Sequence, residues 1–223
     1  MADKIKDQIA AGELKENEQL MTEMELSKAY NISRITVRKA LELLVDEEIL
    51  TKRQGIGAFV TGKKLLRSMN TMMGFTQTCE MNGQKATSRL LFAGLSEARP
   101  RDIRLFGIKE GDSVISVRRL RFCDDVPVMI EDSYYPKRME FLLKENLLGS
   151  TYEFFHNHGL IPTHSVKTVE ICYATPEEAQ RLGVPEKHAL LLQKDEVFDQ
   201  DNEVLHYSKL LTNPQRYRLT IVT

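Results

Sequence analysis

The fold of the first part of the chain is decided by residues 33–41, which read Ser33-Arg34-Ile35-Thr36-Val37-Arg38-Lys39-Ala40-Leu41. Serine is a favoured N-cap, so we expect a helix that begins at this serine. At helical spacing one side gathers Val37, Ala40, Leu41 and Leu44, and the other carries Ile35, Arg38, Lys39 and Glu42. An exposed isoleucine among cations suits a helix in the DNA major groove, where arginine meets phosphates or guanine edges and an apolar side chain meets a thymine methyl.

Two helices and a hairpin are expected around this helix. Residues 3–11 predict a short helix that ends at Gly12, and Thr22 is a good N-cap for a second helix. After the third helix, two short strand-like runs flank Gln54-Gly55-Ile56-Gly57 and predict a β-hairpin. Three helices and a hairpin make a winged helix-turn-helix, in which the third helix enters the major groove and the hairpin reaches the backbone or minor groove beside it.

The remainder of the chain predicts an α+β domain with a mainly antiparallel sheet and helices against it. We expect strands at residues 86–95, 113–122, 126–135, 166–173, 190–198, 204–211 and 216–222, and helices at 101–106, 137–144, 151–157 and 176–182. Residues 63–70 are polar and lack periodicity, which indicates a linker. The expected organisation is therefore a DNA-binding domain at 1–62, a linker at 63–70 and a second domain at 71–223.

Composition limits the class of protein. The chain has 223 residues and a net charge of -1, which excludes a globally basic nucleic-acid coat, although basic residues concentrate between Lys28 and Arg67. Three widely spaced cysteines suggest neither a disulfide framework nor a zinc site. His156 and His158 have no third ligand at a diagnostic spacing, so we expect no metal and no other cofactor. Without an apolar run of roughly 18 residues or a signal-peptide core, we expect a cytoplasmic protein that does not bind a membrane.

Two arginines indicate a site for an anion in the second domain. Strand alternation puts Arg119 and Arg121 on one face, among apolar neighbours. Unpaired buried charge is costly, so both guanidinium groups need an anionic partner. Phosphate is a natural partner, because the planar donors of arginine match its oxygens. The alternatives are pairing with Glu131 or Asp132 inside the protein, or exposure at the edge of a sheet.

Two sets of motifs resemble a known family. Residues 33–41, followed by Arg53-Gln54-Gly55-Ile56-Gly57-Ala58-Phe59-Val60, resemble the DNA-binding domain of GntR-family bacterial transcription regulators. The second domain looks like the UTRA effector-binding domain of the HutC-type subfamily, through Arg119-Leu120-Arg121, Val126-Pro127-Val128-Met129-Ile130-Glu131 and Arg216-Tyr217. The sequence departs from the family pattern in the second helix, where Met24 stands in place of an arginine that commonly reaches DNA.

The resemblance implies a ligand-responsive repressor that binds a palindromic operator in double-stranded DNA as a homodimer. Arg34 and Ile35 are expected to read bases, Thr36, Arg38 and Lys39 to contact phosphates, and Gly57 to bring the wing to the minor groove. The full set of expected DNA-binding residues is Thr22, Ser33, Arg34, Ile35, Thr36, Arg38, Lys39, Arg53, Gly55 and Gly57.

The resemblance also implies a small anionic effector, most simply a sugar phosphate. In sugar-phosphate-binding members of the subfamily, the phosphate is held by residues matching Phe75, Thr76, Arg119, Arg121 and Ser150, and a carboxylate matching Glu131 holds sugar hydroxyls. His206 replaces an acidic residue that is often seen in the next-to-last strand, and Thr212 replaces an aromatic residue. We therefore expect the phosphate to be bound in the same way, with Glu131 and His206 contacting an effector whose remaining part differs from that of the known sugar phosphates.

Three alternative functions stand beside the repressor. The UTRA fold is similar to that of chorismate lyase, so an enzyme domain fused to a DNA-binding module is one hypothesis. Glu131 and His206 are the evident acid–base candidates, but no nucleophile motif accompanies them, so we expect no catalytic residue and no enzyme. The others are a regulator that senses a non-phosphorylated carboxylate and an architectural DNA binder with a purely structural second domain.

Overall fold

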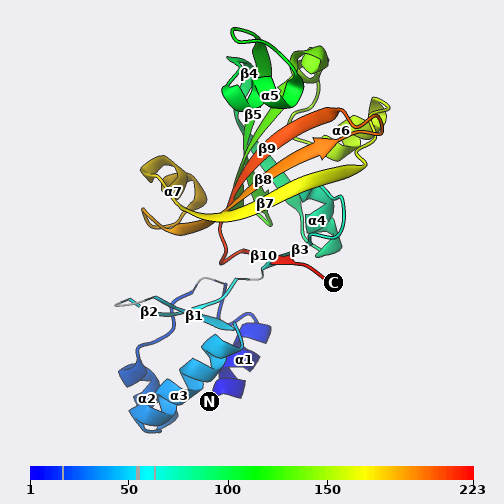
Figure 1. Cartoon of the computed structure of the whole chain (residues 1–223). Coiled ribbons are helices and arrows are strands. Elements are labelled where there is room, and N and C mark those ends of the chain that lie inside the picture. The colour runs from blue at the N-terminus through cyan, green and yellow to red at the C-terminus, as the bar shows by residue number, and fades with distance from the viewer. Residues whose placement is uncertain (17, 54–55, 63) are drawn as a thin grey trace. The chain divides into compact units, whose positions relative to one another are not determined.

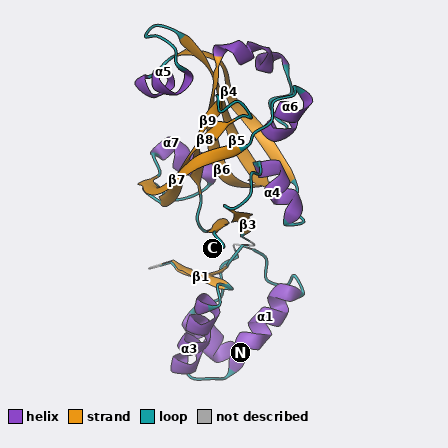
Figure 2. Ribbon diagram, turned by 45° about the vertical axis from the view of Figure 1, so that its right-hand side comes forward, coloured by secondary structure: helices purple, strands orange, loops and turns teal. Residues whose placement is uncertain are grey.

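The computed structural model covers residues 1–223 and describes all of them except 17, 54, 55 and 63 (Figure 1). The chain forms two compact units, Met1–Lys63 and Lys64–Thr223. The first is a helical unit with a small antiparallel sheet, and the second combines a six-stranded antiparallel sheet with helices (Figure 2). Both confirm the fold class expected from the sequence. No helix in the described part of the chain is long and apolar enough to cross a membrane.

The first unit is a winged helix-turn-helix. Its elements are α1 (Ala2–Ala10), α2 (Glu23–Tyr30), α3 (Arg34–Asp46) and the antiparallel pair β1 (Leu50–Arg53) and β2 (Gly57–Val60). The N-caps set the helix starts as expected: Thr22 forms a capping box with Glu25, and Ser33 Oγ accepts from the Thr36 amide at 3.1 Å. The inward face of α3 is confirmed, because Val37, Leu41 and Leu44 are buried in the core of this unit.

The second unit is organised around its six-stranded sheet, in which every neighbouring pair is antiparallel and the order is β4-β5-β6-β9-β8-β7 (Figure 1). The strands are β4 (Ala86–Glu97), β5 (Ser113–Cys123), β6 (Val126–Pro136), β7 (His164–Tyr173), β8 (Ala189–Phe198) and β9 (Val204–Thr212). All six lie within a few residues of the expected ranges. The hairpin between β5 and β6 turns at Asp124 and Asp125, both at positive φ, as the sequence indicated.

Four of the five helices in this unit were expected. They are α5 (Pro100–Phe106), the 3₁₀ helix η1 (Lys137–Lys144), α6 (Thr151–Asn157) and α7 (Pro176–Leu182). The fifth, α4 (Phe75–Met81), was not expected. Its N-cap is Gly74, which has no side chain with which to cap a helix, and this removes the main local signal of a helix start.

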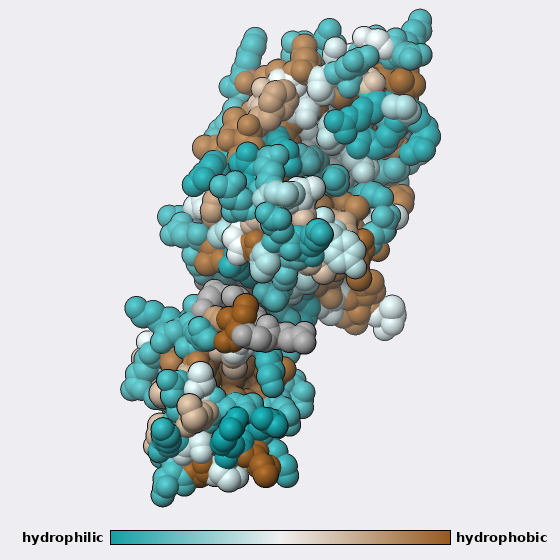
Figure 3. Space-filling view, turned by 90° about the vertical axis from the view of Figure 1, so that its left-hand side faces the viewer, coloured by the Kyte–Doolittle hydropathy of each residue, from teal (hydrophilic) through white to brown (hydrophobic). Residues whose placement is uncertain are grey.

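Residues 65–68 differ from the linker that the sequence indicated. They form β3 (Leu65–Ser68), which pairs in parallel with β10 (Tyr217–Thr220). The side chain of Asn82 also bonds to both backbone groups of Leu66. The pairing partner lies at the far end of the sequence, so no local periodicity announces this strand. On the face shown in Figure 3, hydrophobic and hydrophilic side chains are interspersed over both units, and the larger apolar clusters lie in the interior.

Candidate functional site

The outer face of α3 carries the residues expected to meet DNA. Arg34, Thr36, Arg38 and Lys39 are exposed, and Ile35 has 71% of its surface exposed. An isoleucine this exposed contributes little to the core of its own domain. The face therefore offers two guanidinium groups, an ammonium group and an apolar side chain within about two helical turns.

One acidic side chain lies among these cations. Arg38 donates to both carboxylate oxygens of Glu23 on α2, from Nη2 at 2.9 Å and from Nε at 3.2 Å. Arg34 Nη2 lies 3.9 Å from the same carboxylate. The Arg38 hydrogen bond lowers the pKa of Glu23. Glu23 thus holds Arg38 in one orientation and competes with any phosphate that would take its place.

The remaining expected DNA contacts lie at helix starts and in the hairpin. The Thr22 and Ser33 side chains cap α2 and α3, so their observed partners are within the protein. Gly57 has a φ of +139°, and a Cβ there would lie 3.0 Å from Gln19 Nε2, which itself donates to the Ile56 carbonyl at 2.8 Å. A side chain at Gly57 would therefore be strained by the backbone conformation, and the Gln19 amide would have to shift. Arg53 ends β1 opposite Gly57, while its side chain and Gly55 lie outside the described residues.

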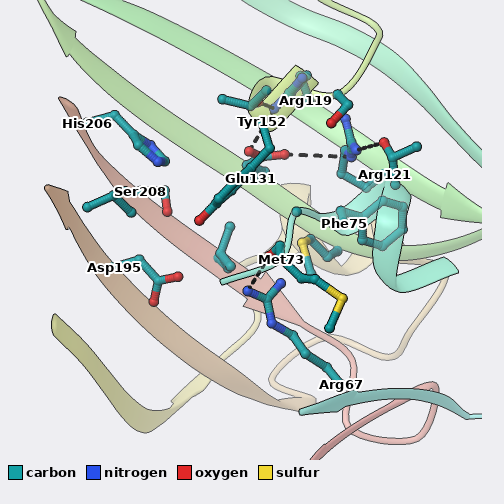
Figure 4. A pocket seen from close by; sticks show the side chains of 17 residues that line it. Arg67, Met73, Phe75, Arg119, Arg121, Glu131, Tyr152, Asp195, His206 and Ser208 are labelled. Atoms are coloured by element: carbon teal, nitrogen blue, oxygen red, sulfur yellow. Dashed lines mark hydrogen bonds and ion pairs between the residues drawn. The ribbon is translucent and has the colours of Figure 1, made fainter. Parts of the chain in front are cut away.

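A cavity in the second unit brings together all seven residues expected to bind the effector (Figure 4). Its walls come from β5, β6, β8 and β9 of the sheet and from the starts of α4 and α6. The seven residues are Phe75, Thr76, Arg119, Arg121, Glu131, Ser150 and His206.

Arg119 makes four hydrogen bonds within the protein, although its buried Nε has no acceptor among the described residues. Its Nη1 donates to the carbonyl oxygens of Leu147 at 3.0 Å and Gly149 at 3.1 Å. Its Nη2 donates to Glu131 Oε1 and to Thr151 Oγ1, both at 2.7 Å. The intramolecular alternative considered from the sequence is thus realised at this arginine. Arg119 ties the segment before α6 to β5 and has few donors left for a ligand.

Arg121 is far less engaged. Its contacts are a long bond from Nη1 to the Gly149 carbonyl at 3.4 Å and a bond from Nη2 to Thr76 Oγ1 at 3.2 Å, and its guanidinium lies 4.7 Å from the centre of the Phe75 ring. Its Nε, like that of Arg119, is buried without a hydrogen-bond acceptor among the described residues, and it lies 3.6 Å from Glu131 Oε2. Burial lowers the pKa of Arg121 to about 10, against the opposing effect of Glu131. A buried cation with free donors is suited to receive an anion.

Glu131 is the carboxylate between the two arginines. Burial by itself would raise its pKa, but the guanidinium groups of Arg119 and Arg121 and the Ser133 hydroxyl bring it down to about 2. Arg119 Nη2 lies 2.7 Å from Oε1, whereas the nearest nitrogen of Arg121 lies 3.6 Å from Oε2. Glu131 is therefore charged at neutral pH and is shared unequally between the arginines.

His206 forms part of the opposite wall. Its ring stacks on Tyr135 with centroids 5.5 Å apart, and neither ring nitrogen has a hydrogen-bond partner among the described residues. Burial lowers its pKa to about 4, so the imidazole is neutral at pH 7. A neutral imidazole offers one donor and one acceptor, which fits a ligand hydroxyl.

Several cavity residues were not anticipated. Asp195 on β8 and Ser208 on β9 face the cavity, and Arg67 reaches it from β3. Both oxygens of Asp195 accept from Gln193 Nε2, at 2.9 and 3.0 Å, and Oδ2 also accepts from Lys167 Nζ at 2.7 Å. Asp195 could have been predicted from the alternation along β8, which places this acidic residue on the inward face. Arg67 could not, because residues 63–70 were expected to form a linker. Within the described ranges, no group of three or more side chains has the arrangement of a metal site.

Comparison with protein families agrees with the assignment of both units. Residues 1–60 match the bacterial regulatory proteins of the gntR family, and residues 81–218 match the UTRA domain. The chain belongs to the GntR family, in its HutC subfamily. The family resemblance inferred from the sequence is thereby confirmed.

Relatives of this GntR-family chain extend over nearly its whole length. The transcriptional repressor NagR of Bacillus subtilis is 30% identical, covering 96% of this chain and 89% of that protein. The probable fructoselysine utilization operon transcriptional repressor of Escherichia coli K12 is 31% identical with the same coverage. The crystal structure of PhnF from Mycobacterium smegmatis, at 22% identity, has a TM-score of 0.73 and covers 100% of this chain and 99% of that one, which shows the shared fold.

These findings settle the general function. This GntR-family chain is a transcription regulator whose helix-turn-helix binds DNA and whose UTRA domain binds an effector. The relatives are transcription regulators, which removes the enzyme hypothesis.

Proposed function

We propose that this regulator is a repressor that binds a palindromic operator as a homodimer and whose operator affinity is controlled by a sugar phosphate in the UTRA cavity. The observation that carries the effector class is the state of Arg121, a buried cation at a cavity wall whose Nε makes no hydrogen bond and lies 3.6 Å from Glu131 Oε2. Because the single Glu131 carboxylate is shared between two arginines, a phosphate would supply further acceptor oxygens and a second negative charge.

The surroundings of Arg121 support phosphate as the group it binds. The hydroxyl groups of Thr76 and Ser150 line the same part of the cavity, and each can donate to a phosphate oxygen. Glu131, His206 and Ser208 line the same cavity and offer acceptors and donors for hydroxyl groups. A phosphate joined to a hydroxyl-rich sugar matches these groups. The similar proteins named as repressors, including one named for fructoselysine utilization, support the same class of control.

For DNA we propose that α3 enters the major groove, with Arg34 and Ile35 reading bases and Thr36, Arg38 and Lys39 contacting phosphates. The wing residues Arg53, Gly55 and Gly57 would approach the minor groove, and the starts of α2 and α3 at Thr22 and Ser33 the backbone. A two-fold dimer would place its two α3 helices on half-sites about one helical turn apart. The exposure of Ile35 and its neighbouring cations supports this assignment.

A thermal-shift comparison tests the effector class. The probes are inorganic phosphate, glucose 6-phosphate, glucosamine 6-phosphate and the two sugars without phosphate. Stabilisation by ligand follows RT ln(1 + [L]/Kd), so the phosphorylated probes are expected to raise Tm and the free sugars to leave it unchanged. The Arg121→Met variant is expected to lose the response.

The matched control is Arg118→Met. Arg118 also lies on β5 but faces the other way, where it pairs with Asp132. Its loss is expected to leave the response intact. Equal stabilisation by the free sugars, or a full phosphate response in Arg121→Met, would overturn the proposed effector class. Gel-shift titration of an operator fragment with the best probe then tests the control of DNA binding, and sedimentation tests the homodimer.

A further inference from the structure

Arg67 is a buried cation that β3 carries into the effector cavity. Only 4% of its surface is exposed, whereas its neighbour Leu66 is half exposed, so the strand turns Arg67 inward. Figure 4 shows its guanidinium entering from the side of β3, away from Arg119 and Arg121. The pairing of β3 with β10 and the bonds from Asn82 to Leu66 fix this strand from both sides.

The guanidinium group of Arg67 is only partly satisfied by the protein. Nη2 donates to the Met73 carbonyl at 2.8 Å, but Nε is buried and has no acceptor among the described residues. A guanidinium group has five donors, and leaving them unpaired away from water is costly. The cavity is lined by Arg67 on one side and by the hydroxyl of Ser208 and the imidazole of His206 on another, so a ligand between them can reach these groups.

The positive charge of Arg67 also has no carboxylate of its own with which to form an ion pair. Arg119 pairs with Glu131, and the other cavity carboxylate, Asp195, has Lys167 on Oδ2 and Gln193 on both oxygens. Among the described residues no carboxylate forms an ion pair with Arg67, although, against the opposing effect of burial, Tyr217 and the more distant Asp195 favour its charged form and raise its pKa. A buried cation without a partner is stable only when something anionic accompanies it.

We propose that Arg67 binds a carboxylate at the end of the effector opposite its phosphate, so that the effector is a phosphorylated sugar acid or a compound of the same kind. The planar fork of arginine matches the two oxygens of a carboxylate. The inference rests on the proposed function, because it places the phosphate at Arg121. It goes further in naming a second anionic group and the residue that selects it.

Two probes that differ only in this group test the proposal. In 6-phosphogluconate the carbon opposite the phosphate is a carboxylate, and in glucitol 6-phosphate the same carbon is a hydroxymethyl group. Titration calorimetry of the full chain is expected to give about ten-fold tighter binding of 6-phosphogluconate, a difference of about 1.4 kcal/mol. In Arg67→Met the two dissociation constants are expected to become equal, while Arg121→Met loses both ligands.

Arg218→Met is the matched control, because Arg218 lies on β10 opposite Leu66 and its side chain is exposed. It is expected to keep the ten-fold preference. Arg67→Lys, which keeps a cation but not the fork, covers the case in which Arg67→Met does not fold, and is expected to reduce the preference. Equal binding of the two probes by the wild type, or a full preference in either Arg67 variant, overturns the inference alone. Failure of both probes and of inorganic phosphate to bind the wild type overturns the proposed function and the inference with it.

Discussion

Arg119 donates from Nη2 to Glu131 Oε1 at 2.7 Å, while the nearest nitrogen of Arg121 lies 3.6 Å from the same carboxylate. Although burial opposes it, Glu131 raises the pKa of Arg119, whereas burial prevails at Arg121 and lowers its pKa to about 10. Two arginines that are equivalent in the sequence pattern thus differ in their contacts: Arg119 makes four hydrogen bonds within the protein, whereas Arg121 makes two long ones and is the one that we expect to bind a ligand.

The Arg119→Met and Arg121→Met variants are therefore expected to differ in their free energy of unfolding. Arg119→Met leaves Glu131 buried without its main partner and should lower the free energy of unfolding by about 3–5 kcal/mol. Arg121→Met removes a poorly solvated charge and should change it by less than about 1 kcal/mol. Urea denaturation of both variants measures the difference. Equal losses of stability would contradict the division of roles.

The loss of stability at acid pH is expected to arise in part from protonation of the Glu131 carboxylate. Its pKa falls from 4.5 to about 2 on folding, so its contribution is complete above pH 4.5 and is lost as the pH falls toward 2. The wild type should lose roughly 2–3 kcal/mol more than Glu131→Gln across this window, because each pKa unit corresponds to 1.36 kcal/mol. The free energy of unfolding is measured at several pH values between 6 and 2. Parallel curves for the two proteins would show that Glu131 is not the group responsible.

Glu23 is expected to restrain DNA binding. Its carboxylate occupies Arg38 and lies near Arg34, so Glu23→Gln should release a guanidinium for a phosphate. Binding at low salt should tighten, and the slope of log Kobs against log[salt] should steepen by about 0.9. Fluorescence anisotropy over a salt series measures both. Glu47→Gln, which breaks a pair with Lys6 at the other end of α3, is the control and should leave the slope unchanged; weaker binding by Glu23→Gln would show instead that Arg38 needs this partner.

Ile35 is expected to affect sequence preference without affecting stability. With 71% of its surface exposed, Ile35→Ser should change the free energy of unfolding by less than about 0.5 kcal/mol. Loss of an apolar contact to a thymine methyl should reduce the preference for operator over random DNA by about 1 kcal/mol. Competition binding gives this ratio. Leu43→Ser, at a residue 48% exposed two turns further along α3, is the matched control, and an identical loss there would mean that Ile35 reads no base.

The winged helix-turn-helix was predictable because its signals are local. Thr22 and Ser33 mark two helix starts, and Asn31 provides the left-handed residue, φ 51°, that ends α2 between them. Thr22 and Ser33 bond to backbone amides only three positions away, and Asn31 acts through its own left-handed backbone conformation. The helix boundaries of this unit can therefore be predicted from a single sequence.

The UTRA cavity was predictable only in part. Alternation along β5 gave Arg119 and Arg121 the same face, and the structure places both at the cavity. Alternation does not reveal partners, so the pairing of Arg119 with Glu131 and the relative freedom of Arg121 required the coordinates. Arg67 was missed for a different reason, since its strand exists only through pairing with β10.

The pairing of β3 with β10 also sets an order for folding. Asn70 and Val222, which flank the paired residues, bond to each other across 152 positions of sequence. During synthesis β3 emerges directly after the winged helix but has no strand to pair with until residues 217–220 are made. The DNA-binding unit relies on nearby contacts and can complete early, whereas closing so long a loop is slow. A newly made chain thus acquires its means of binding DNA before its effector cavity, and with it Arg67, is complete.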